Sequence, residues 1–214
     1  MTSEPISARA DQVADWIETR CLLAGHSLSA SALAEGTRHG GLRSSDIDLG
    51  LRTMAHRAAV TGPAYPFVVG SGASARQDAQ RSVWAALLLM GPSSPARKGW
   101  SLPQAAQLLE TITCHAVSRL YGPDTKAIRF GWPSDVGRPF AFSDAVRWLA
   151  AEMGVKAGDG YRPPHSKDGG VDVVAWRPFP DGRSGFPVLL VQCTVERNYA
   201  HKANDIETRV WSGW

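Results

Sequence analysis

The chain has 214 residues, of which 43% are hydrophobic and 20% are charged, and its formal net charge at pH 7 is +3. This composition is typical of a folded globular protein and excludes an intrinsically disordered one, while the length allows one domain or two small ones. The mild positive charge permits a nucleic-acid partner but does not indicate one, because many basic proteins bind none.

Neither a membrane-spanning segment nor a signal peptide is expected. The longest apolar run, residues 83–90, is far shorter than the roughly 18 residues that a membrane-spanning helix needs. The first residues lack the basic and then apolar layout of a signal peptide, which favours a cytoplasmic protein. Three widely spaced cysteines, Cys21, Cys114 and Cys193, form no C-x-x-C pair and indicate neither a disulfide framework nor a zinc site.

Helical periodicity dominates the first two thirds of the chain. Apolar residues recur at helical spacing, with breaks at glycine, and Ser101 followed by Pro103 is typical of a helix start. The patterns predict helices at 8–25, 27–37, 44–62, 75–91 and 101–122, and short extended segments at 64–69 and 126–133. We therefore expect residues 1–138 to form a helical region for recognition or interaction.

A helix-turn-helix at residues 10–36 is an alternative interpretation of this region. The segment 27–35 (SLSASALAE) has the small residues of the first helix of such a motif. The segment that follows, 36–45 (GTRHGGLRSS), does not have the pattern of a recognition helix. An all-helical packing module is therefore favoured.

The sequence changes character near Pro139. An amphipathic helix is predicted at 140–155, with Ser143 as its cap, and a loop at 156–170. Two short β-branched segments, 171–176 and 187–196, are predicted strands that flank a turn containing Asp181-Gly182. Residues 198–214 are predicted to be a helix. This order indicates an α/β domain over residues 139–214.

Each of the two strands contains a polar residue among apolar neighbours. Because strand side chains alternate between faces, Asp172 is expected near Gln192, with Thr194 and Glu196 further along the same row. A buried acid needs a partner, and a divalent metal such as Mg²⁺, which prefers oxygen ligands, is one. A satisfied polar pair, or a row that faces water, is the alternative.

The stretch GGVDVVAW, the hairpin and LLVQCT resemble the PD-(D/E)XK nuclease superfamily, the fold of many restriction endonucleases. That family has an acid on one strand, a hairpin, and then Glu-x-Lys or Gln-x-Lys on the next strand. The resemblance implies an α/β (α+β) fold in which the helical region precedes a restriction endonuclease-like core at 139–214. It also implies Mg²⁺ or Mn²⁺ as cofactor, with Asp172 and Gln192 as metal ligands and catalytic residues. A further acid is expected on the preceding helix, where Glu152 and Asp144 are candidates.

The family's lysine is missing from its expected position, because residue 194 is threonine. Threonine carries no charge and cannot replace a lysine that orients water and offsets phosphate charge. Some relatives supply this lysine from elsewhere in the chain. Lys202, at the start of the predicted last helix, is the first candidate for the catalytic lysine, and Lys167 is the second.

The chain stops where the family core usually continues into another strand. Two exposed-looking tryptophans, Trp211 and Trp214, lie at this end. Either the chain is a fragment, or a protein partner or a second copy covers the open sheet edge.

The resemblance implies a metal-dependent DNA endonuclease of restriction or phage-defence type, with DNA as its partner. The alternative is a catalytically inactive nuclease-fold module that binds nucleic acid or assembles a complex. Thr194 favours the inactive module, whereas Asp172, Gln192 and a relocated lysine favour the enzyme.

Overall fold

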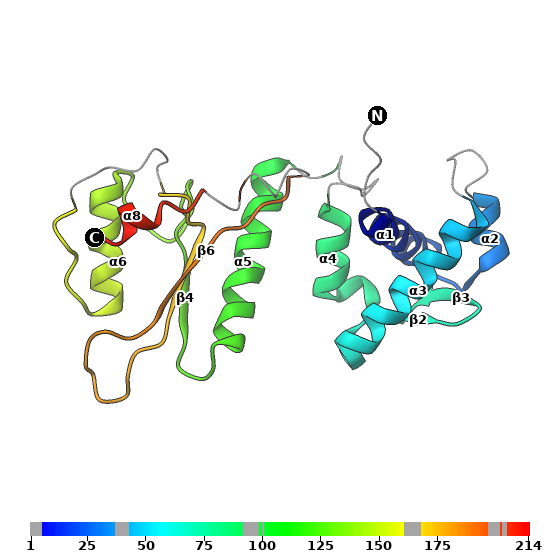
Figure 1. Ribbon diagram of the computed structural model, residues 1–214, viewed down its shortest axis with the longest axis horizontal. Helices are drawn as coiled ribbons and strands as arrows, with labels where there is room; N and C mark the ends of the chain where they lie inside the picture. The colour runs from blue at the N-terminus through cyan, green and yellow to red at the C-terminus, as the bar shows by residue number, and fades with distance from the viewer. Residues whose placement is uncertain are drawn as a thin grey trace. The chain divides into compact units, whose positions relative to one another are not determined.

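The computed structural model describes residues 6–36, 43–91, 99, 101–160, 168–196, 202 and 205–214. The chain divides into two compact units, Met1–Trp100 and Ser101–Trp214, which Figure 1 shows with their helices and strands labelled. The boundary lies earlier than the change of sequence character near Pro139, because the helix and the strand that begin the second unit pack against that unit's own sheet. Within the described residues, no helix is long and apolar enough to cross a membrane.

The first unit contains both helices and a small sheet. Its elements are α1 (Ile6–Ala24), β1 (Leu28–Ser29), α2 (Ala30–Gly36), α3 (Ser44–Thr61), η1 (Gly62–Ala64), β2 (Phe67–Val69), β3 (Gly72–Ala75), η2 (Ala79–Arg81) and α4 (Val83–Met90). The strands form an antiparallel sheet in the order β1-β3-β2. The strand β2 confirms the extended segment predicted at 64–69, whereas β1 and β3 were not predicted, so this unit is not the all-helical module that the sequence favoured.

The order of these elements places a helix pair, α2 and α3, ahead of a β-hairpin. The short strand β1 pairs with β3 of this hairpin and completes the sheet. The helix α3 begins at Ser44, and residues 37–42 of the segment between the two helices lie outside the described residues. The helix-turn-helix at residues 10–36 therefore stays an untested alternative.

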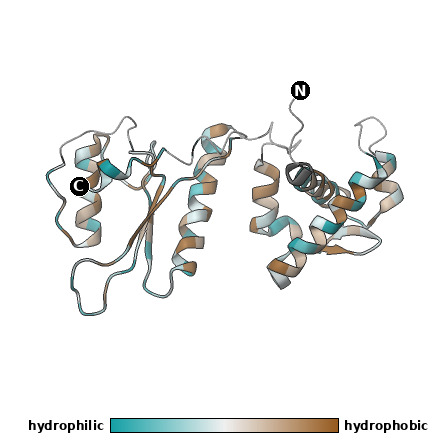
Figure 2. Ribbon diagram, in the orientation of Figure 1, coloured by the Kyte–Doolittle hydropathy of each residue, from teal (hydrophilic) through white to brown (hydrophobic). Residues whose placement is uncertain are grey.

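A buried carboxylate ties the elements of the first unit together. The side chain of Glu18 on α1 is fully buried and accepts hydrogen bonds from Arg57 Nη1 on α3 at 2.9 Å, Tyr65 Oη at 2.7 Å and Trp84 Nε1 on α4 at 2.8 Å. These donors offset the cost of burying the charge. Figure 2 shows that α4 is hydrophobic over most of its length, and its buried residues join the apolar core of this unit.

The second unit is a three-stranded antiparallel sheet between helices. Its elements are α5 (Leu102–Leu120), β4 (Lys126–Arg129), α6 (Phe142–Met153), β5 (Val173–Trp176), β6 (Val188–Val191) and α8 (Thr208–Trp211). The strand order is β4-β5-β6, with β5 central. Figure 1 shows α5 on one side of this sheet and α6 on the other. The mixed α and β class expected from the sequence is confirmed.

Alternation along β5 divides its side chains between the two faces of the sheet. Val173 and Ala175 pack towards Val117 of α5, whereas Val174 and Trp176 pack with the buried face of α6. The helix α5 begins as predicted, because Ser101 Oγ accepts the Gln104 N–H and Pro103 occupies the first turn. The helix α6 instead begins at Phe142, so Ser143 lies inside the helix and is not its cap.

The C-terminal tryptophans are packed rather than exposed, which corrects the expectation. The ring of Trp211 lies 5.3 Å from that of Phe130 and 5.4 Å from that of Phe142, and Trp214 lies 5.9 Å from Phe142. The long helix predicted for 198–214 is wrong, because the described residues 205–207 are not helical and separate the helical Lys202 from the short helix α8. Edge-to-face aromatic contacts of this kind hold the C-terminal segment on the sheet.

Candidate active site

Asp172 directly precedes β5, at the end of the sheet where the neighbouring strands β4 and β6 stop. Its backbone N–H donates to Val191 O at 2.9 Å, and its carbonyl accepts from Phe130 N at 2.7 Å and from Gly131 N at 3.0 Å. These bonds extend the ladders of β4 and β6 by one residue on each side of β5. The carboxylate Oδ2 accepts the N–H of Cys193 at 2.6 Å, which fixes the side chain.

A second carboxylate, Glu110 of α5, faces Asp172 across Gly131. A Cβ atom at position 131 would lie 3.2 Å from Asp172 Oδ1 and 3.4 Å from Glu110 Oε2. The two carboxylate oxygens are therefore no further apart than the sum of these distances. Because glycine has no side chain, the space between the carboxylates stays open. Glu110 is 8% exposed, so this acid is almost entirely buried.

Arg129 at the end of β4 holds Glu110 in place. Its Nε and Nη2 atoms lie 2.9 Å and 2.8 Å from Glu110 Oε2. Its Nη1 atom bonds to Asp135, which also accepts from Gln107 Nε2 at 2.9 Å. Planar guanidinium donors fix the orientation of a carboxylate more firmly than a single bond would.

The surroundings of the two acids disfavour their charged forms. The pKa of Asp172 is raised to about 6, mainly by burial and also by the nearby charges of Glu110 and Asp168, while the Cys193 N–H and Lys202 oppose the change. Burial also raises the pKa of Glu110, against the opposing effect of Arg129. Perturbed carboxylates that face one another are typical of sites that bind a cation or transfer a proton.

Gln192 and Lys202 are linked through Asp205 beside this pair. Gln192 Nε2 donates to Asp205 Oδ2 at 3.0 Å, and Lys202 Nζ lies 3.7 Å from the same oxygen and 3.9 Å from Glu196 Oε1. The charge of Lys202 also lowers the pKa of Asp172, so this lysine lies within electrostatic range of the carboxylate. Gln192 follows the end of β6, and its amide bonds to Asp205 whereas the Asp172 carboxylate bonds to Cys193.

The acids proposed on α6 lie elsewhere. The buried residues of α6 face the side of the sheet opposite α5. Glu152 is exposed, and Asp144 is exposed and pairs with Arg147 at 3.1 Å. The further acid of the cluster is Glu110, from the helix that precedes β4. Lys167 lies outside the described residues. Thr194 Oγ1 accepts the N–H of Glu196 at 3.2 Å.

Sequence reasoning missed Glu110 and Arg129. The one local signal for Glu110 is an acid at a buried position of an amphipathic helix, where burial without a partner would be costly. Its proximity to Asp172 depends on how α5 packs on the sheet, and sequence spacing does not report that packing.

The donor set can be compared with the needs of a divalent cation. Among the described residues, no group of three or more His, Cys, Asp or Glu side chains is placed to hold a metal ion. Mg²⁺ is often held by one or two carboxylates, with water and substrate phosphate completing its six positions. Asp172 and Glu110 fit that smaller requirement, because both present oxygens to the space over Gly131.

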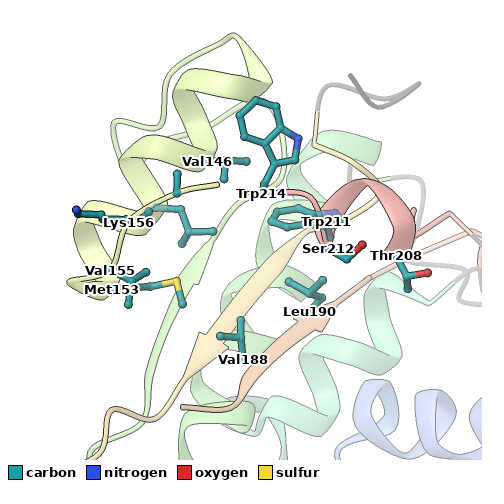
Figure 3. Close-up of a pocket in the computed structure, with 13 residues that line it drawn as sticks. Val146, Met153, Val155, Lys156, Val188, Leu190, Thr208, Trp211, Ser212 and Trp214 are labelled. Atoms are coloured by element: carbon teal, nitrogen blue, oxygen red, sulfur yellow. The ribbon is translucent and has the colours of Figure 1, made fainter. Parts of the chain in front are cut away.

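Two cavities in the second unit differ in chemistry. One, of about 300 Å³, opens beside Glu110 and Arg129. The other, of about 370 Å³, is mainly apolar, and Figure 3 shows side chains of α6, β6 and the C-terminal segment, including Trp211 and Trp214, around it. No acid lines the second cavity among the described residues, so the chemistry-bearing groups gather at the first.

Asp172 and Glu110 are the centre of the candidate site. It combines two carboxylates whose pKa values are raised, an arginine that holds one of them, and a nearby lysine at one end of a sheet. Comparison with protein-family models, with curated proteins and with solved structures finds no match to this chain.

Proposed function

We propose that the chain is a metal-dependent DNA endonuclease, of the restriction endonuclease-like type that the sequence resembles. The observation that carries the proposal is the meeting of Asp172 and Glu110 over Gly131. The helix α5, which carries Glu110, precedes a three-stranded antiparallel sheet, and Asp172 directly precedes its central strand β5. These features also support a PD-(D/E)XK core in which α5 is the first helix and α6 is inserted between β4 and β5.

In this proposal, Asp172 and Glu110 hold Mg²⁺ or Mn²⁺. A bound divalent cation would polarise the phosphoryl oxygen and lower the pKa of a coordinated water. The Cys193 N–H keeps Asp172 Oδ2 in position and leaves Oδ1 directed towards the space beside Glu110. Arg129 keeps Glu110 oriented, and its charge limits the repulsion between the two acids.

Lys202 takes the role of the missing lysine. Positive charge near a phosphate stabilises the charge that develops during hydrolysis, and such electrostatic stabilisation is usually the largest catalytic contribution. Lys202 acts on the pKa of Asp172, which supports its assignment over Thr194. Gln192 positions Lys202 indirectly, because both side chains approach the same oxygen of Asp205.

The first unit supports DNA as the partner. Its element order is that of a helix-turn-helix with a β-hairpin, and the second helix of such a pair enters the major groove. The exposed side chains along α3 include Arg52 and His56, together with the acid Asp48. We assign DNA binding to this face by analogy of fold, with the basic side chains as phosphate contacts.

The second candidate is a catalytically inactive nuclease-fold module. Lys202 is close to two acids, Glu196 and Asp205, and this observation favours the inactive module because it reduces the positive charge available to a phosphate. Such a module would bind DNA without cutting it.

Cleavage assays distinguish the two candidates. We expect the wild type to cut plasmid or linear DNA with Mg²⁺ or Mn²⁺, and Asp172→Asn and Glu110→Gln each to lower the rate by about a hundredfold or more, as for the loss of a group that stabilises the transition state. Asp144→Asn, an equal change on the exposed side of α6, should cut at the wild-type rate. DNA binding without cleavage under all these conditions would favour the inactive module.

A further inference from the structure

A pair of large aromatic side chains is exposed beside the acid cluster. Trp132 is 38% exposed and Phe140 is 58% exposed, and their rings meet edge to face at 5.1 Å. Residues of this size are usually buried. Two exposed aromatic rings at the mouth of a site therefore indicate a contact surface for a ligand.

The position of Trp132 is fixed from beneath by a buried arginine. Arg138 is 4% exposed, and its guanidinium lies 5.8 Å from the centre of the Trp132 ring and 4.4 Å from the centre of the Phe130 ring in the core. Its Nη1 atom donates to Pro139 O at 3.0 Å. The tryptophan is thus held in a defined orientation before any ligand arrives, which lowers the entropic cost of binding.

The cavity of about 300 Å³ connects this tryptophan to the acids. Trp132 and Pro133 line it on one side, and Glu110, which faces Asp172 across Gly131, lines it as well. The lining is completed by Leu102, Pro103, Ala106, Gln107, Arg129, Val195 and Glu196. Its volume is within the range of small-ligand sites.

The lining is suited to a planar heterocycle rather than to a phosphate. Leu102, Pro103 and Trp132 offer apolar and aromatic surface against which a flat ring can stack, while Gln107 offers a polar amide at the edge. The acids Glu110 and Glu196 would repel a phosphate inside the cavity, since like charges at close range disfavour binding. Among the described residues that line the cavity, the one cation, Arg129, is already paired with Glu110 and Asp135. A neutral ring would not be repelled by the acids of the cavity.

We propose that this cavity takes an unpaired DNA base, stacked on Trp132, while the adjoining phosphodiester lies at Asp172 and Glu110. Base stacking on an aromatic side chain tolerates any sequence, because every base has a π face. The proposal rests on the proposed function and adds the substrate class, which is DNA with a nucleotide that is single-stranded or displaced from the duplex.

The test measures binding of fluorescein-labelled oligonucleotides by anisotropy, with full-length protein and without a divalent cation, so that no cleavage occurs. The probes are a dT 12-mer, a 12-mer of the same backbone without bases, and a 12-base-pair duplex. We expect the dT 12-mer to bind at least about fivefold tighter than the strand without bases. Trp132→Ala should remove this difference, and Trp132→Phe should keep most of it.

Phe179→Ala is the matched control. Like Trp132, Phe179 has an arginine beside its ring, with the Arg183 guanidinium 4.5 Å from the ring centre, but it does not line the cavity. Phe179→Ala should bind the dT 12-mer and the strand without bases like the wild type, and thermal unfolding should show that each variant is folded. Equal affinity of the wild type for strands with and without bases, or equal binding by Trp132→Ala and Phe179→Ala, would overturn the inference.

The inference and the proposed function fail in different ways. Cleavage that depends on Asp172, without any effect of Trp132 on base-dependent binding, leaves the endonuclease proposal in place and removes the base-binding cavity. Base-dependent binding that is lost in Trp132→Ala, without cleavage by the wild type, keeps the cavity and favours the inactive module.

Discussion

Asp172 carries a charge that its surroundings disfavour. Desolvation is the main cause, and the neighbouring acids Glu110 and Asp168 add to it, so the pKa rises to about 6. A residue with a side chain at position 131 would fill the space between Asp172 and Glu110. The local geometry therefore keeps two carboxylates close together at some cost in stability, as is common at sites whose chemistry requires it.

We expect this cost to appear as a dependence of stability on pH. The folded pKa of about 6 lies above the usual value of 3.8, so the stability that the protonated acid provides at low pH is lost as the pH rises through about 6. Asp172→Asn keeps an acceptor for the Cys193 N–H and cannot ionise. At pH 8 the free energy of unfolding of Asp172→Asn should be about 1 kcal/mol higher than that of the wild type, a figure that allows for solvent screening. At pH 4 the two proteins should be equally stable. Urea unfolding at both values is the measurement.

A divalent cation should stabilise the wild type but not Asp172→Asn, and so offset the difference in stability between them at pH 8. Mg²⁺ or Mn²⁺ at pH 8 should raise the melting temperature of the wild type, because binding to the folded state stabilises it, and should leave that of Asp172→Asn unchanged. Asp144→Asn should respond like the wild type. An equal response in all three proteins would place the cation elsewhere.

At the scale of elements, the sheet of the first unit depends on the close approach of two backbones. Its strands are short, with two residues in β1 and three in β2, and β3 has the sequence GASA. A Cβ atom at Gly72 would lie 2.2 Å from Leu28 O on β1. Only glycine at this position lets β1 and β3 pair as they do.

Gly72→Ala should therefore destabilise the first unit. We expect a loss of more than about 2 kcal/mol in the free energy of unfolding, because either the β1–β3 pairing or the backbone must shift. Gly70→Ala is the matched control, since no atom lies within 4 Å of a Cβ at that position in the same hairpin. Urea unfolding of the three proteins, followed by circular dichroism, measures the difference. Similar losses in both variants would show that the contact with Leu28 is unimportant.

At the scale of the whole molecule, the proposal assigns DNA binding to the first compact unit and cleavage to the second. The first carries the helix pair α2 and α3 followed by a β-hairpin, and the second carries the carboxylate pair. A nuclease assembled in this way would obtain most of its affinity for DNA from the first unit, through phosphate contacts that are sensitive to salt.

Arg52 on the exposed side of α3 tests this division. Arg52→Glu should weaken binding to a DNA duplex by about tenfold and should reduce the slope of log affinity against log salt, as for loss of a phosphate contact. Arg119→Glu, the same charge change at an exposed position near the end of α5 in the second unit, controls for net charge. Equal weakening by the two changes would mean that only overall charge matters. Both affinities are measured by anisotropy over a range of salt concentrations.

The sequence by itself determined most helices and the two strands around the hairpin. Amphipathic spacing predicted α1, α3, α5 and α6, and β-branched runs predicted β5 and β6, because both periodicities are local properties of the chain. The same local reading missed β1 and β3, which are too short, and in β3 too rich in small residues, to show an alternating pattern.

Only the tertiary structure decided which acids meet. Glu110, which Arg129 holds, faces Asp172 because α5 packs on the sheet and β4 pairs with β5, bringing together residues that are far apart in the chain. Gln192 lies near Asp172 in the sheet, yet its amide bonds to Asp205, which the folding of the C-terminal segment brings to it. The local periodicity of a segment predicts the face of the helix or strand on which each side chain lies. Its partners depend on how whole elements pack, because that packing is determined by the burial of apolar surface across the entire unit.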